Sequence, residues 1–169
     1  MFDINTPKNV KKEVFQTEET FLQGTKDGSE AFIRKIGKND SYIYTHEVRQ
    51  YLREERIQKK RQLTAREYIE MLDQAARGYI KLKKFRQCFT YLGQYFMVET
   101  LLNVDQQPSL LRVESSKTQS DLQIPGFVNV LREVTQDDKY ASGTIAKIGW
   151  KMPEEDRKAI RKVAQQSVS

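Results

Sequence analysis

The stretch that decides the fold is residues 79–91, which read Tyr79-Ile80-Lys81-Leu82-Lys83-Lys84-Phe85-Arg86-Gln87-Cys88-Phe89-Thr90-Tyr91. Its aromatic side chains from Phe85 onward all fall on one set of alternate positions, and Lys84 and Arg86 fall on the other set. Successive side chains of a β-strand point to opposite faces of a sheet. The pattern therefore predicts a strand with one apolar and one cationic face, and Gly93 predicts a turn after it.

Several other segments are β-prone, lack helical spacing and are separated by glycine or polar turns. Consecutive segments of this kind predict antiparallel hairpins. We expect strands over Glu13–Gln23, Ala31–Ile36, Ser41–Arg49, Gln94–Leu102 and Ser109–Glu114. The densely charged residues 50–62 predict an irregular segment and a further strand, with a helix over Tyr51–Lys60 as the alternative.

Three short helices are predicted around this sheet. Thr64-x-x-Glu67 is a capping box, and the apolar spacing that follows predicts a helix over Thr64–Ala76. Pro125 at a helix start predicts a second helix that ends near Thr135. Acidic residues that follow Pro153 complement a helix N-terminus and predict a C-terminal helix near 153–166.

The composition sets only broad limits on the function. The chain has 169 residues, a length that suits one domain over residues 1–169. Its 29 Lys and Arg against 23 Asp and Glu give a net charge of +6, which favours phosphates, nucleic acid or anionic lipid headgroups as partners. A single cysteine excludes an intrachain disulfide, and the sequence shows no signal peptide or apolar span, so we expect a cytoplasmic protein.

Basic residues recur on several of the predicted strands. In a half-exposed sheet such residues need only form a solvated face, which is the simplest interpretation. A closed or strongly curved sheet would instead bring them to one volume, where phosphate oxygens would accept charge-assisted hydrogen bonds. The candidate ligand-binding residues are Arg34, Arg49, Arg56, Lys60, Lys84 and Arg86.

Six segments, in this order along the chain, resemble the CYTH, or triphosphate tunnel, superfamily. They are Ile33-Arg34-Lys35, Tyr44-Thr45-His46-Glu47-Val48-Arg49, Lys60-Arg61-Gln62-Leu63-Thr64-Ala65-Arg66-Glu67-Tyr68, Lys84-Phe85-Arg86-Gln87-Cys88-Phe89, Leu110-Leu111-Arg112-Val113-Glu114 and Glu133-Val134-Thr135-Gln136-Asp137-Asp138-Lys139-Tyr140. The resemblance covers about Val14 to Ile145. It is closest to the branch in which a CYTH-like domain follows a P-loop nucleotide-binding domain, as in TRPL translocation defect proteins.

The resemblance implies an α+β fold, an eight-stranded antiparallel β tunnel or barrel with flanking short helices. In this superfamily basic residues that line the tunnel bind triphosphate or polyphosphate, and carboxylates hold Mg²⁺ or Mn²⁺. By position, Glu114 and Glu133 would be the metal-binding carboxylates here. Catalytic members include inorganic, thiamine and RNA triphosphatases and class IV adenylate cyclases.

This chain departs from the motifs of the catalytic members. They open with Glu-x-Glu-x-Lys, which Lys11-Lys12-Glu13-Val14-Phe15 does not supply. Arg112 stands two residues before Glu114 and should share its face, where a cation repels a divalent metal. We therefore expect binding of a phosphorylated anion, such as a nucleoside triphosphate, a polyphosphate or a phosphoinositide headgroup, with weak or no catalysis. The alternatives are a metal-dependent triphosphatase and a domain that binds nucleic acid or a membrane surface.

Overall fold

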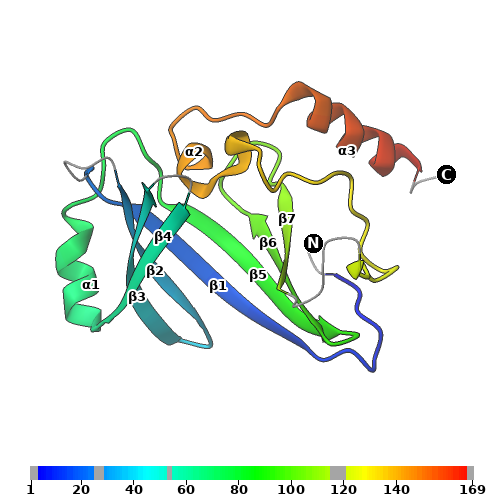
Figure 1. Ribbon diagram of the computed structural model, residues 1–169, viewed down its shortest axis with the longest axis horizontal. Helices are drawn as coiled ribbons and strands as arrows, with labels where there is room; N and C mark the ends of the chain where they lie inside the picture. Colours follow the sequence, from blue (N-terminus) through cyan, green and yellow to red (C-terminus); the bar gives the residue numbers. More distant parts are fainter. Residues whose placement is uncertain (1–3, 25–28, 53–54, 115–120, 167–169) are drawn as a thin grey trace.

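The computed structural model describes residues 4–24, 29–52, 55–114 and 121–166, with the side chains of 51–56 and 164–166 left aside (Figure 1). Most of this part of the chain is antiparallel sheet, accompanied by short helices. The strands are β1 (Lys12–Phe21), β2 (Glu30–Lys38), β3 (Ser41–Leu52), β4 (Glu55–Leu63), β5 (Leu82–Tyr91), β6 (Gln94–Leu101) and β7 (Ser109–Glu114). The helices are α1 (Ala65–Leu72), α2 (Ser142–Ile145) and α3 (Glu154–Gln166), with a 3-10 turn at Asp138–Tyr140. None of the described helices has both the length and the apolarity needed to cross a membrane.

Tight turns set the strand register. Leu92 and Gly93 both have positive φ, at 49° and 72°, and they join β5 to β6 as a two-residue hairpin loop. Such a loop matches the right-handed twist of the strands, so it fixes which residues face each other along the hairpin. Asn39 and Asp40, at φ 50° and 61°, join β2 to β3 in the same way.

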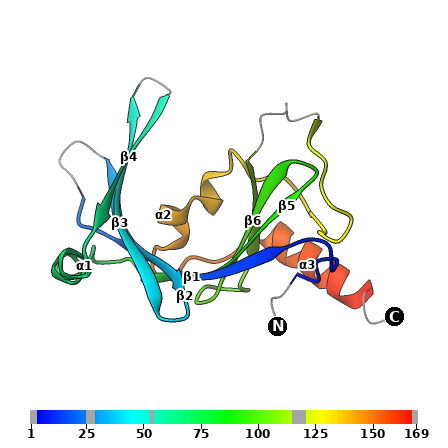
Figure 2. The same ribbon diagram turned by 90° about the horizontal axis from the view of Figure 1, so that it is seen from below.

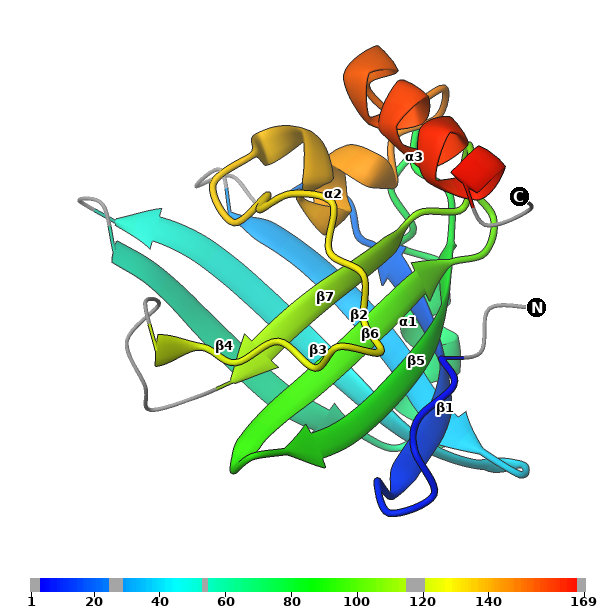
Figure 3. The ribbon, with the colours of Figure 1, turned by 90° about the vertical axis from the view of Figure 1, so that its right-hand side faces the viewer.

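The sheet has the order β4-β3-β2-β1-β5-β6-β7 and curls into a half-barrel. Figure 2 shows α2 inside the curl, between the wall formed by β3 and β4 and the wall formed by β5 and β6. Figure 3 shows the same helix over one end of the strands. In the described part of the chain no pairing joins the edge strands β4 and β7. The α+β antiparallel tunnel-type fold is confirmed, although the described residues form seven strands where eight were predicted.

The segment around α2 closes one end of the concave face. Phe21, Phe32, Leu82 and Leu101 of the sheet pack there against Tyr140, Ile145 and Ala146. Gly143 of α2 lies so close to Glu30 that a Cβ at this position would overlap the Oε1 atom of Glu30. The backbone of α2 thus lies directly against the end of β2.

The convex face carries α1. Tyr68 of this helix packs with Ile33 and Leu63, and its ring centroid lies 4.7 Å from that of Tyr44. The capping box is confirmed, because Glu67 N donates to Thr64 Oγ1 and Thr64 N donates to the Glu67 carboxylate. The helix ends at Leu72 and so is shorter than predicted.

Two helix predictions are wrong and one is confirmed. The alternative helix over Tyr51–Lys60 is absent, because these residues belong to β3 and β4 where they are described. Residues 125–135 are irregular: Phe127 packs on Phe89 at 5.5 Å between ring centroids. Packing of that half-buried ring on the sheet outweighs the helix start signal of Pro125. The C-terminal helix is confirmed as α3.

The packing at the closed end predicts a large cost for Phe32→Ala. Phe32 has no exposed surface, and its ring centroid lies 5.5 Å from that of Phe21. Truncation leaves a cavity, so we expect urea titrations to show a free energy of unfolding lower by about 3–5 kcal/mol. Ile69→Ala, at a side chain that is 65% exposed, should change it by less than about 0.5 kcal/mol. Equal losses in the two variants would contradict this description of the core.

Candidate anion-binding site on the concave face

Arg34 lies at the centre of a network of ion pairs on the concave face. It belongs to β2 and faces Glu19 of β1 in the strand register. Its Nε and Nη2 atoms donate to Glu19 Oε1 at 3.0 and 2.8 Å, and its Nη1 atom donates to Glu47 Oε1 of β3 at 2.6 Å. One guanidinium therefore links three neighbouring strands.

The network continues across β1 into β5 and β6. Lys84 Nζ of β5 lies 2.9 Å from Glu19 Oε2 and 3.7 Å from Glu99 Oε2 of β6. Arg86 of β5 faces Glu99 and donates to its Oε1 atom from Nε at 3.0 Å and from Nη2 at 2.5 Å. Lys84 Nζ also donates to Ser142 Oγ of α2 at 3.2 Å, so the network touches the closed end.

Neutral groups complete the hydrogen bonding of Glu47. Gln58 Nε2 of β4 donates to Glu47 Oε2 at 2.7 Å, and Thr45 Oγ1 donates to Oε1 at 3.2 Å. Together with Arg34, these donors satisfy both carboxylate oxygens of a residue that has no exposed surface. Buried charges are tolerated in proteins when they are paired in this way.

Arg49 extends the cationic surface beside this network. Its guanidinium carbon lies 4.4 Å from the ring centroid of Phe32, and that of Arg34 lies 5.2 Å from the same ring. Arg49 Nη1 is also 3.5 Å from Glu30 Oε2. The aromatic ring thus supports two guanidinium groups that share the concave face.

The neighbouring cations lower the pKa of Glu19. Complete burial by itself raises the pKa of this carboxyl, but the nearby charges of Lys84 and Arg34 outweigh burial and lower the pKa to about 2. Burial likewise opposes ionisation of Glu99, and Lys84 and Arg86 again lower its pKa below the ordinary value. Both carboxylates are therefore ionised at neutral pH.

The structure brings together four of the six predicted ligand-binding residues, Arg34, Arg49, Lys84 and Arg86. Lys60 faces Glu47 in the register of β3 and β4 and is exposed at the rim of the same face. Arg56 lies in β4, but its side chain is outside the described residues.

The predicted metal-binding carboxylates lie away from the centre of the network. Glu114 is exposed at the end of β7, where it faces Tyr95. Glu133 is exposed in the irregular segment before the 3-10 turn and accepts a hydrogen bond from Thr135 Oγ1 at 2.7 Å. Neither takes part in the ion pairs given above for Glu19, Glu47 and Glu99.

The interior carboxylates Glu19 and Glu99 were missed as principal site residues. Strand alternation could have placed Glu19 and Thr17 on one face of β1, which offers one carboxylate where the Glu-x-Glu motif has two. Thr17 is buried, and its hydroxyl has no hydrogen-bond partner. The two-residue loop at Leu92 and Gly93 could have paired Glu99 with Arg86.

A divalent metal does not fit the carboxylates as they are placed. Among the residues that the structure describes, no group of three acidic, histidine or cysteine side chains is arranged to hold a metal ion. Glu19, Glu47 and Glu99 each face Arg or Lys at ion-pair distance, and those cations occupy the oxygens that a metal would need. In this arrangement the carboxylates serve as partners of the basic residues.

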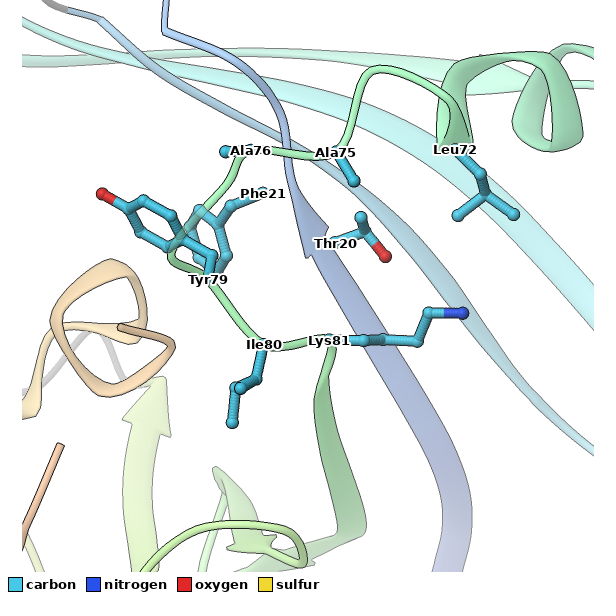
Figure 4. Close-up of a pocket in the computed structure, with 8 residues that line it drawn as sticks. All are labelled: Thr20, Phe21, Leu72, Ala75, Ala76, Tyr79, Ile80 and Lys81. Carbon is cyan, nitrogen blue, oxygen red and sulfur yellow. The ribbon is translucent and has the colours of Figure 1, made fainter. Parts of the chain in front are cut away.

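A separate cavity of about 240 Å³ lies between the end of β1 and the chain that follows α1 (Figure 4). Its lining is mainly apolar and includes Phe21, Leu72 and Tyr79, with Lys81 at one side. It contains none of the carboxylates or guanidiniums of the network. The charged concave face, and not this cavity, is the candidate site.

Comparisons with known proteins bear on the fold. Two solved structures are similar, one titled the hypothetical protein NE1496 and the other the inorganic triphosphatase NE1496. The first has a TM-score of 0.57 at 19% identity and the second 0.58 at 20%, each covering 85% of this chain and 91% of the other. The chain has the triphosphate-tunnel fold. No protein-family model and no curated protein matches it, and the closer resemblance to TRPL translocation defect proteins stays a prediction.

The lowered pKa of Glu19 predicts an acid-dependent loss of stability. The carboxyl has a folded-state pKa of about 2 against 4.5 ordinarily, so its contribution is present above pH 4.5 and is lost as pH falls toward 2. The corresponding change in the free energy of unfolding is on the order of 3 kcal/mol. Urea titrations between pH 2.5 and 6.5 should show a difference between the wild type and Glu19→Gln that shrinks with acid. For Glu70→Gln, at an exposed carboxyl, the free energy of unfolding should change with pH in parallel with that of the wild type. A parallel curve for Glu19→Gln would contradict the lowered pKa of Glu19.

Proposed function

We propose that the chain binds a phosphorylated anion on the concave face of its curled sheet. The observation that carries the proposal is the continuous row of Arg34, Lys84 and Arg86, reached from β2 and β5 and joined through buried carboxylates. Guanidinium and ammonium groups form their strongest hydrogen bonds with anionic oxygens such as those of phosphate. The side chains of Arg34 and Arg86 remain 14% and 12% exposed, so an incoming anion has access to them.

The balance of charge supports an anion over a cation as the ligand. Four basic residues, Arg34, Arg49, Lys84 and Arg86, stand against three buried carboxylates and the partly exposed Glu30, so these paired groups balance. Lys60 adds a further positive charge at the rim. A ligand with several negative charges would exchange some of the internal ion pairs for contacts with its own oxygens.

The second candidate function is a metal-dependent triphosphatase. Its support is the similarity of fold to a structure titled as an inorganic triphosphatase, together with the presence of carboxylates beside the cations. Mg²⁺ or Mn²⁺ would then have to displace a basic residue from Glu19, Glu47 or Glu99. The present pairing of these carboxylates favours binding with weak or no hydrolysis.

A double variant that keeps the net charge unchanged tests the binding proposal. In Arg86→Gln/Glu99→Gln, two amides replace an ion pair, so the network loses a cation without leaving an unpaired buried charge. Against Glu99→Gln alone, which also lacks the carboxylate, we expect isothermal titration with tripolyphosphate in EDTA to show the affinity of the double variant reduced by about tenfold or more, equivalent to about 1.4 kcal/mol. Arg66→Gln, at an exposed helix residue, is the control and should bind as the wild type does. Equal affinities of the double variant and of Glu99→Gln would refute this site, and binding of nucleic acid or acidic liposomes that survives the double substitution would favour the outer basic surface.

The single variant Glu99→Gln separates the two candidate functions. Removing the carboxylate frees Arg86 and Lys84 for the ligand, so a binding site should gain about tenfold in affinity for tripolyphosphate without metal. A triphosphatase that uses Glu99 for Mg²⁺ or Mn²⁺ should instead lose metal-dependent phosphate release. Folding is checked by the thermal unfolding temperature at pH 7.

A further inference from the structure

The antiparallel sheet has a gap beside the end of β1. The pairing of β1 with β5 ends where Glu19 faces Leu82, so none of the described pairs joins Thr20 to β5. Past this point the chain that follows α1 takes the place of β5, because Ala76 N donates to Phe21 O at 2.8 Å. The apolar cavity of about 240 Å³ lies at this break in the strand pairing (Figure 4).

The walls of this cavity are held in place by contacts with the rest of the chain. Ile80 N donates to Ala146 O at 2.8 Å, which ties the segment before β5 to the end of α2. Tyr79 of the same segment stacks on Phe21, with 5.6 Å between ring centroids and 28° between ring planes. The cavity is therefore preformed, as the binding sites of small molecules usually are.

A buried hydroxyl group at this cavity lacks a partner. Thr20 is only 6% exposed, and its Oγ1 atom has no hydrogen-bond partner among the residues that the structure describes. Figure 4 shows this hydroxyl directed between the side chains of Leu72 and Lys81. Burial of a hydroxyl without a hydrogen bond lowers the stability of a protein. A ligand that brings a polar atom into the cavity would supply the missing hydrogen bond.

The ammonium group of Lys81 determines which polar group suits the ligand. Lys81 lines the cavity and is 42% exposed, and its Nζ atom lies 3.8 Å from Glu18 Oε2, which is beyond hydrogen-bond distance. Ion pairs between partly exposed groups at such distances are weak. Glu18 also faces Lys83 in the register of β1 and β5. Because an ammonium group can only donate, it favours an accepting and preferably anionic oxygen on the ligand.

We propose that this cavity binds a small aromatic carboxylic acid, whose ring lies against Phe21 and Tyr79 and whose carboxylate accepts hydrogen bonds from Thr20 and Lys81. A cavity of about 150 Å³ is large enough for benzene. The cavity of about 240 Å³ therefore has room for one ring with a short side chain. The site shares no residue with the ion-pair network of the concave face, so it is independent of the proposed function.

The test compares phenylacetate with 2-phenylethanol, which keeps the ring and the chain length but has no charge. We expect NMR titration of the ¹⁵N-labelled full chain at pH 7 to show saturable shifts of the amide signals of Thr20, Ala75 and Ala76. Phenylacetate should bind about threefold or more tightly than the alcohol, because only its carboxylate is attracted by Lys81.

Two variants separate ligand binding from a merely structural role of these residues. Thr20→Val removes the hydroxyl, so the thermal unfolding temperature should rise while the affinity for phenylacetate falls by about tenfold. Lys81→Gln should abolish the preference for phenylacetate over the alcohol. Arg77→Gln is the matched control, because Arg77 is an exposed cation of the same segment that does not line the cavity, and it should keep the preference.

Three results would overturn this inference. The first is the absence of saturable shifts at the three amides in the wild type. The second is an affinity for phenylacetate that Thr20→Val leaves unchanged. The third is a preference for phenylacetate that persists in Lys81→Gln, and this result decides alone if Thr20→Val does not fold. Titration of the same samples with tripolyphosphate tests the proposed function separately, since neither variant alters the concave-face network.

Discussion

The charged concave face of the curled sheet depends on the guanidinium of Arg34. It donates to Glu19 and to Glu47, so strands β1, β2 and β3 meet at one partly buried cation. Each carboxylate would be costly to bury without a cation, and each cation would be costly without a carboxylate. Apolar packing at the closed end and α1 on the convex face then fill the space around an arrangement whose charges must stay together.

Much of the fold could be predicted because its signals are local. Alternation in residues 79–91 marks β5, and the capping box at Thr64 marks the start of α1. The site was harder to predict from the sequence. Arg34 and Lys84 are linked by ion pairs with Glu19, which lies on the strand between theirs. The sequence predicts that cations recur on strands, but the order of the strands decides which carboxylates they meet.

The helices that the structure does not show have a common physical origin, which is that local signals were outweighed by packing on the sheet. Charged residues 50–62 have no apolar stripe that distinguishes a helix from an edge strand, and pairing with β3 decides the outcome. Pro125 is compatible with a helix start, yet burial of Phe127 on β5 holds that segment in an irregular path. The metal-binding roles of Glu114 and Glu133 stay predictions. They were inferred from order along the chain, which does not show that both side chains are exposed or that residue 133 lies outside any helix.

Many of the basic residues on the concave face are already paired with carboxylates of the same chain. The basic residues of the concave face are held by internal carboxylates, so under the proposed function an anion would meet groups that are already oriented and partly neutralised. Preorganisation of this kind lowers the entropy lost on binding, and the internal ion pairs set the free energy that a ligand must exceed. Selectivity at such a site follows from how many of these pairs a given ligand replaces.

The close contact between Gly143 and Glu30 leaves no room for a side chain at position 143 of α2. A methyl group there would have to move either the carboxylate of Glu30, which neighbours Arg49, or the helix itself, which carries the hydroxyl bound by Lys84. The space beside this glycine is filled by the end of the Glu30 side chain. An alanine at this position would therefore displace that carboxylate or α2, although glycine itself offers no functional group.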